Sequence, residues 1–117
     1  MKLYHKGSGN PICNKLRFAK GIFGKLKGLM LERKESFDYC LLFDFGSEER
    51  IGASIHMMFV FFPIYAVYLD SNKKVVDTAI LQPFALNYTP KAPARYLIEM
   101  PIAFSEKVSL GNELDWK

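Results

Sequence analysis

The sequence predicts a mainly β fold: a compact β-sandwich or squashed barrel of short strands with two short helices, in a single domain over residues 1–117. Three observations lead to this prediction. Residues 37–45 (FDYCLLFDF) alternate between the two faces of a strand, and residues 55–70 are rich in aromatic and β-branched side chains. Gly, Pro, Asn and Ser punctuate the chain between short apolar segments. Many short strands separated by turns are typical of sandwiches and barrels.

The elements follow from the local patterns of apolar residues and turn signals. We expect strands over residues 1–4, 12–19, 37–45, 53–60, 64–70, 75–81, 94–100 and 113–117, and short helices over 20–31 and 103–110. A hairpin turn over residues 71–74, an exposed loop over 46–52 and a long proline-containing loop over 82–93 connect them.

The segment 37–45 is the clearest strand. Its odd-numbered residues are all apolar, whereas Asp38 and Asp44 lie on the opposite face. We therefore expect Phe43 to be almost fully buried, and Asp44 to be exposed or paired. The two aspartates are about 20 Å apart along a strand, too far to act as a catalytic pair.

The central stretch, residues 55–70, carries no formal charge before Asp70. It is shorter than the roughly 20 residues of a membrane-spanning helix, and Pro63 would break a helix. We expect two strands with a bend at residues 61–63. Both strands are apolar on both faces, which places them centrally in the fold.

Composition bounds the class of protein. Half of the 117 residues are hydrophobic and 15% are aromatic, which excludes a disordered chain. With no secretory signal and no membrane span evident, we expect a cytoplasmic protein. Cys13 and Cys40 match no metal-ligand spacing; we expect buried free thiols, with a disulfide as the alternative. We expect no metal and no cofactor, and the oligomeric state stays open.

Positive charge is concentrated at the start of the chain. Residues 1–34 contain nine Lys or Arg and one acid, a net charge of +8, and residues 35–117 have a net charge of −4. A polyanion-binding surface would use Lys15, Arg17, Lys20, Lys25 and Lys27. The alternative, which we favour, is that the basic third is solvated or folds against the acidic remainder, so nucleic acid is not an expected partner.

Several motifs occur in an order and spacing that resemble a known family. They are Lys27-Gly28-Leu29-Met30, Leu41-Leu42-Phe43-Asp44-Phe45, His56-Met57, Pro63 with Leu69-Asp70, Lys74-Val75-Val76, Ala94 through Pro101, and Leu110-Gly111-Asn112. Together they resemble the domain of unknown function 192 family, also called uncharacterised protein family 0127, from residue 12 to residue 116.

The resemblance implies a compact, sandwich-like β domain and no established activity. Many members of the family have Trp-Met-Lys-Asn-Thr at residues 56–60 and Pro-Leu-Asp at residues 63–65. The polar Lys, Asn and Asp of that pattern are absent here. A site built on those groups in other members would be lost or differently built in this chain.

Candidate site residues come from the central stretch and its neighbours. His56 and Glu99 are the catalytic candidates, because imidazole and carboxyl groups act as general acids and bases. His56, Met57, Arg33 and Arg95 are the binding candidates. For each charged residue the alternative is a structural one: Glu99 and Arg95 each need a partner from another strand, and Arg33 would pair with a carboxylate.

Three functions remain open at this point. The first, which we place ahead, is a small-molecule or peptide-binding module with a cleft near His56 and the loop from Pro83 to Pro93. The second is an enzyme that uses His56 or Glu99. The third is a weak binder of nucleic acid or another polyanion through the basic N-terminal third.

Overall fold

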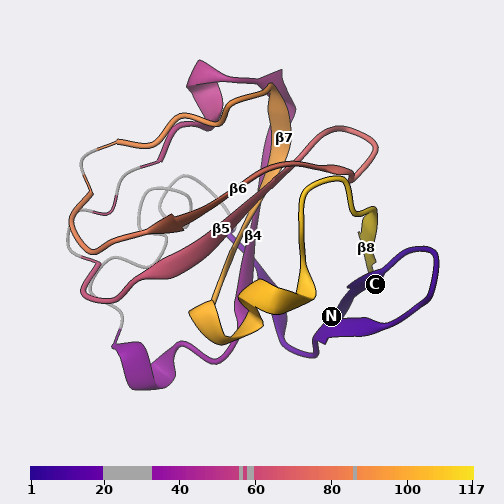
Figure 1. Cartoon of the computed structure of the whole chain (residues 1–117), viewed down its shortest axis with the longest axis horizontal. Helices are drawn as coiled ribbons and strands as arrows, with labels where there is room; N and C mark the ends of the chain where they lie inside the picture. The colour runs from indigo at the N-terminus through magenta and orange to yellow at the C-terminus, as the bar shows by residue number, and fades with distance from the viewer. Residues whose placement is uncertain (20–32, 56, 58–59, 86) are drawn as a thin grey trace.

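A computed structural model describes residues 1–19, 33–55, 57, 60–85 and 87–117, which form two β-sheets (Figure 1). The smaller sheet is antiparallel and has the strand order β2-β1-β8. Its strands are β1 (Leu3–His5), β2 (Pro11–Cys13) and β8 (Leu114–Trp116). The two ends of the chain lie side by side at this sheet, because the backbone N–H of Lys2 donates to the carbonyl of Lys117 at 2.9 Å.

The larger sheet has five strands in the order β3-β4-β7-β5-β6. They are β3 (Leu16–Phe18), β4 (Cys40–Glu49), β5 (Ile64–Leu69), β6 (Val75–Leu81) and β7 (Ala94–Met100). Strand β3 runs parallel to β4, and the other neighbours are antiparallel. The spatial order differs from the chain order, since β7 inserts between β4 and β5.

Short 3₁₀ helices are the helical elements of the described residues: η1 (Lys34–Ser36), η2 (Ile51–Ala53) and η3 (Ile102–Lys107). In place of the helix predicted over residues 103–110, the structure has a 3₁₀ helix, η3, which covers residues 102–107 and follows Pro101. The predicted helix over residues 20–31 lies outside the part of the chain that the structure describes.

Apolar side chains cover both faces of the larger sheet and form two cores. The inter-sheet core contains Leu3, Ile12 and Leu114 of the smaller sheet together with Cys40 and Leu42 of β4. The loop-side core, on the opposite face, contains Tyr39, Leu41, Phe43, Met57, Ala66, Tyr68 and Leu97. The predicted alternation of residues 37–45 is therefore confirmed, and so is the burial of Phe43, which is 5% exposed.

The two sheets and the inter-sheet core confirm a mainly β, sandwich-like fold. In the described residues the sheets do not close into a barrel. The strands predicted over residues 75–81 and 94–100 coincide with β6 and β7. In the part of the chain that the structure describes, no helix is long and apolar enough to cross a membrane.

The strand predicted over residues 53–60 is wrong. Among the described residues of this segment, Ile55 makes a bridge, to Tyr88, and the backbone of Met57 bonds to Ala85 and Phe84, which are not in a strand of the sheet. This segment lies against the loop-side core and carries Met57 and Val60 into it. The segment is apolar because it covers a sheet face. A strand buried on both faces has the same apolar pattern, which is why the sequence predicts a central strand here.

Other boundaries differ from the prediction, and the strand expected over residues 37–45 begins at Cys40. The single strand expected over residues 12–19 is divided at Asn14 and Lys15 into β2 and β3, which belong to different sheets. The loop expected over residues 46–52 is partly strand, because β4 continues to Glu49 through an irregular stretch after Asp44. Gly46 adopts φ +83° there, a conformation that glycine tolerates.

Candidate functional site

Glu99 is a buried carboxyl near the middle of the larger sheet. It lies on β7, between Leu41 of β4 and Ala66 of β5, and Ala66 in turn faces Ala79 of β6. The residue is 6% exposed, and among the described residues its Oε1 atom has no hydrogen-bond partner. Burial raises the pKa of Glu99 to about 8, because the charged form loses its hydration. Glu99 is therefore protonated at neutral pH.

A second buried acid, Asp77, points to the same face from β6. Asp77 lies opposite Tyr68 of the neighbouring strand β5 and is 5% exposed. Its Oδ2 atom accepts hydrogen bonds from the Tyr88 hydroxyl at 2.6 Å and from the Lys91 backbone N–H at 3.1 Å. Asp77 is thus paired, in contrast to Glu99.

Two tyrosines complete this group, which we call the Glu99 cluster: Tyr68, Asp77, Tyr88 and Glu99. The rings of Tyr68 and Tyr88 stack with their centroids 6.2 Å apart. The Tyr68 hydroxyl donates to the Ala53 carbonyl at 2.8 Å. Burial, followed by the hydrogen bond to Asp77, raises the pKa of Tyr88 to about 12, and burial with the nearby Glu99 raises the pKa of Tyr68. Both hydroxyls stay protonated at neutral pH.

The covering layer of this face is formed by two chain segments that pair outside the sheets. Ile55 and Tyr88 exchange two backbone hydrogen bonds, at 2.9 and 2.7 Å. The Met57 N–H donates to the Ala85 carbonyl at 2.7 Å, and the Met57 carbonyl accepts from the Phe84 N–H at 2.9 Å. We call this two-segment layer the lip. It brings Met57 and the proline-containing loop to the same sheet face as Glu99.

Of the two catalytic candidates, the structure therefore describes only Glu99. The binding candidate Met57 is buried, at 1% exposed, in the loop-side core. His56, predicted both as a catalytic and as a binding residue, lies outside the described residues.

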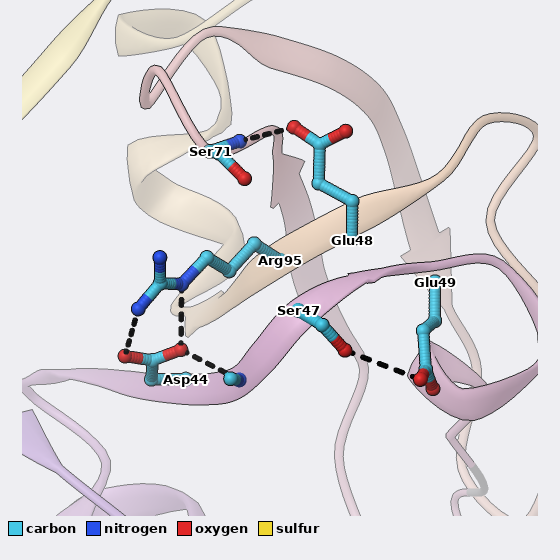
Figure 2. Close-up of polar contacts among 7 residues, drawn as sticks. Asp44, Ser47, Glu48, Glu49, Ser71 and Arg95 are labelled. Carbon is cyan, nitrogen blue, oxygen red and sulfur yellow. Dashed lines mark hydrogen bonds and ion pairs between the residues drawn. The ribbon is translucent and has the colours of Figure 1, made fainter.

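Arg95 lies on β7 as well, but its partner is on another strand (Figure 2). Its Nε donates to Oδ1 of Asp44 at 3.1 Å, and the Asp44 carboxylate raises the pKa of the guanidinium. Asp44 also accepts from the backbone N–H of Gly46, which holds the irregular part of β4 in place. The expectation that Asp44 is exposed or paired is confirmed. Arg95 and Glu99, four residues apart, are not brought together.

Neighbouring carboxylates of β4 have local partners too. Figure 2 shows Glu48 accepting a hydrogen bond from the backbone N–H of Ser71, at 2.6 Å, and Glu49 accepting one from the Ser47 hydroxyl, at 3.1 Å. Arg33, the remaining binding candidate, is exposed beside η1, where its carbonyl accepts from Ser36. These hydrogen bonds are local contacts that hold the chain segments around β4 and η1 in place.

The basic candidates that are described have contacts within the protein. Lys15 pairs with Asp38 at 2.6 Å, and both side chains are more than half exposed. The guanidinium of Arg17 lies 4.1 Å from the ring centroid of Tyr39. Lys20, Lys25 and Lys27 lie outside the described residues. The ion pair of Lys15 with Asp38 joins the basic third to the acidic remainder. It agrees with the alternative that the basic third folds against the rest of the chain.

The nucleic-acid hypothesis has a direct test. We expect no binding of short duplex or single-stranded DNA tighter than about micromolar, because non-specific electrostatic binding lies at about 10⁻⁴ to 10⁻⁶ M. Fluorescence anisotropy titrations at two salt concentrations measure it. Nanomolar affinity that falls steeply with salt would contradict this expectation.

Clefts lined entirely by described residues lie at the smaller sheet, away from β7. One of about 690 Å³ is lined by Met1, Leu3, Tyr4, Pro11 and Lys117 among others. Another, of about 500 Å³, lies beside the turn after β5. Within the described residues, the one buried side-chain atom without a partner belongs to Glu99. The described residues also contain no group of three or more His, Cys, Asp or Glu placed to hold a metal.

Asp77, Tyr68 and Tyr88 were missed as site candidates by the sequence analysis. A signal for Asp77 was available: it is an acid in the predicted strand 75–81 at the same parity as the apolar Val75 and Leu81. Tyr68 and Tyr88 offered no comparable signal, because tyrosine is common in strands and loops alike.

The fold and the site together define a small, mainly β domain in which, among the described residues, one buried carboxyl has an oxygen without a partner. The model of the DUF192 family, described as an uncharacterized ACR, matches residues 4–116. The chain belongs to this family.

Relatives and a solved structure agree with that assignment. A UPF0127 protein of Thermococcus sibiricus is 35% identical over 117 residues, which cover 98% of this chain and 74% of that protein. A UPF0127 protein of Pyrococcus furiosus is 37% identical over 110 residues, covering 92% and 91%. A protein of unknown function from Novosphingobium aromaticivorans has a similar fold, with a TM-score of 0.83 at 15% identity over 99% of this chain and 84% of that one.

Proposed function

We propose that the protein is a small-molecule-binding module whose ligand lies on the loop-side face of the larger sheet and hydrogen-bonds to Glu99. The observation that carries the proposal is the buried Oε1 atom of Glu99, which has no partner among the described residues. A buried polar group without a hydrogen bond costs about 1–3 kcal/mol. A ligand that supplies the missing bond would recover this free energy.

The chemistry of Glu99 limits the ligand. Because the carboxyl is protonated at neutral pH, it donates one hydrogen bond and accepts another. Hydroxyl, amide and carboxylic acid groups complement such a pair. Ala66 and Ala79, which continue the cross-strand row beside Glu99, carry only methyl groups and occupy little volume next to it.

The lip supports the same proposal. It is joined by the four backbone hydrogen bonds of Ile55 and Met57 described above and belongs to neither sheet, so it opens at lower cost than a sheet strand. Phe61 and Phe84, 59% and 41% exposed, lie in edge-to-face contact with centroids 5.2 Å apart near this layer. Exposed aromatic rings are suited to cover the apolar part of a ligand.

A second candidate function, an enzyme that uses Glu99 as a general acid or base, is favoured by the pKa of about 8. An acid–base catalyst is most effective when its pKa lies near the working pH. The binding proposal is placed first because it needs only the unpaired atom, whereas catalysis also needs a substrate with its reacting atom held beside the carboxyl.

A thermal-shift screen of small acids, amides and hydroxylated compounds tests the binding proposal with two variants. Glu99→Leu removes the carboxyl at similar volume, and Glu106→Leu makes the same change at an exposed position of η3. We expect ligand-induced shifts in the wild type and in Glu106→Leu, and none in Glu99→Leu. We also expect the ligand-free melting temperature of Glu99→Leu to be unchanged or higher, because an unpaired buried group is removed.

Two results would contradict the binding proposal. One is a ligand shift that persists in Glu99→Leu; the other is a ligand-free Glu99→Leu protein that melts several degrees lower, which would indicate a purely structural role. NMR spectra of each ligand after incubation separate the two candidate functions. Binding alone returns the ligand unchanged, whereas catalysis gives a product that disappears with Glu99→Gln.

A further inference from the structure

The two cysteines lie together at the junction of the two sheets. Cys13 is the last residue of β2 in the smaller sheet, and Cys40 is the first residue of β4 in the larger sheet. Both belong to the inter-sheet core, at 4% and 0% exposed. Both residues hydrogen-bond to the same carbonyl, that of Lys15, and each thiol shifts the pKa of the other. We propose that Cys13 and Cys40 form a redox site, which a hydroperoxide converts from two thiols into a disulfide between the sheets.

The backbone fixes both cysteines around one residue, Lys15. The Lys15 carbonyl accepts a hydrogen bond from the Cys40 backbone N–H at 2.9 Å and from the Cys13 thiol at 3.2 Å. Cys40 is also the direct neighbour of Leu16 in the pairing of β4 with β3. Strand pairing and the shared Lys15 carbonyl therefore hold the two cysteines close to each other.

The surroundings divide the two thiols into a reactive and a resolving one. The hydrogen bond from Cys40 lowers the pKa of Cys13 to about 6, with further contributions from backbone hydrogen bonds and from the charge of Lys107. The Lys107 Nζ is held close by, where it donates to the Ile12 carbonyl at 3.3 Å. The hydrogen bond to Cys13, together with burial, raises the pKa of Cys40. Cys13 is therefore the thiol that ionises first, and Cys40 is the thiol that stays protonated.

Few other ionisable groups face this pair. The inter-sheet core contains Tyr65 and Tyr96, and the Tyr65 hydroxyl donates to the Val108 carbonyl. The amine of Lys15 points instead to Asp38 at the surface. Among the described residues, Lys107 is the one charged side chain that shifts the pKa of Cys13.

The reaction with hydrogen peroxide balances in two steps. The Cys13 thiolate attacks one peroxide oxygen and the O–O bond breaks; Cys13 becomes a sulfenic acid, and the released hydroxide takes a proton from solvent to form water. The Cys40 sulfur then attacks the Cys13 sulfur, and the S–O bond breaks. The departing hydroxide leaves as water with the proton of Cys40. Two thiol sulfurs are oxidised and one peroxide is reduced to two water molecules.

The disulfide would join β2 to β4 and close a loop of residues 14–39. Such a bond restricts the unfolded chain and stabilises the folded one when the geometry is unstrained. The oxidised protein should therefore melt at a higher temperature than the reduced protein, and a dithiol reductant should reverse the change.

Intact-mass measurement tests the proposal on the whole chain. Protein treated with hydrogen peroxide is denatured and alkylated with N-ethylmaleimide. We expect the wild type to change from two adducts to none, with no species of one adduct and no covalent dimer. Cys40→Ser should stop at a Cys13 sulfenic acid, which dimedone labels, whereas Cys13→Ser should keep its Cys40 thiol under the same treatment.

The pH dependence gives a second readout on the wild type alone. The rate of oxidation should rise as the pH passes about 6 and level off near neutrality, because only the thiolate reacts. An ordinary thiol would instead gain rate through about pH 8.5. The proposal is overturned if the wild type keeps both thiols, if Cys13→Ser reacts as fast as the wild type, or if the rate rises only above pH 8.

Discussion

Replacement of Phe43 by alanine is expected to lower the free energy of unfolding by about 3–5 kcal/mol, the range for a buried Phe truncated to Ala. Phe43 is 5% exposed in the middle of β4, where it faces Leu97 of β7 and packs in the loop-side core. Truncation would leave a cavity in the loop-side core, because the neighbouring side chains are held in place by their own strands. Urea denaturation monitored by circular dichroism measures the change.

Phe61→Ala is the matched control for Phe43→Ala. Its ring is 59% exposed and has one described aromatic contact, to Phe84. We expect a loss of about 1 kcal/mol or less, since exposed positions contribute little beyond such a contact. A loss under about 1 kcal/mol for Phe43→Ala, or equal losses for both variants, would be inconsistent with the packing described for β4.

The largest pH effect is expected from Glu99. Its pKa is raised from an ordinary value of 4.5 to about 8, so between these values the folded protein holds a proton that the unfolded chain has released. Stability therefore falls as the pH rises through this window, by about 1.4 kcal/mol per pH unit, and levels off above pH 8. Glu99→Gln removes this dependence because an amide does not titrate.

The experiment compares free energies of unfolding of the wild type and Glu99→Gln from pH 5 to pH 8. We expect the variant to gain on the wild type steadily with pH, with the largest advantage at pH 8. Glu106→Gln, the same change at an exposed carboxylate, should run parallel to the wild type. Parallel curves for Glu99→Gln and the wild type would mean that Glu99 is ionised in the folded protein.

The sequence predicts those elements of the fold whose residue pattern depends on neighbours along the chain. The alternation of residues 37–45, and the strands at 75–81 and 94–100, were predicted because each depends on a few adjacent residues and nearby turns. Residues 53–60 were not, because an apolar segment that covers a sheet and a strand buried on both faces have the same composition. The pairing of Ile55 with Tyr88, and of Met57 with Phe84 and Ala85, separates the two cases.

The site shows the same limit. Glu99 was a candidate from the sequence, as was Met57, yet their position on one sheet face depends on β7 lying between β4 and β5. Arg95 and Glu99 look equivalent in sequence, each a charged residue on β7. The structure gives Arg95 a carboxylate partner and leaves an oxygen of Glu99 without one among the described residues.

The sequence by itself determined the mainly β class, the alternating faces of the clearest strands and the family resemblance, because these depend on local pattern and motif order. Tertiary structure alone decided the strand order, the meeting of Cys13 with Cys40 and the burial of Glu99. Each of these brings together residues that are distant along the chain, and side-chain burial depends on which strands flank a residue. The raised pKa of Glu99 is therefore a property of the assembled sheet.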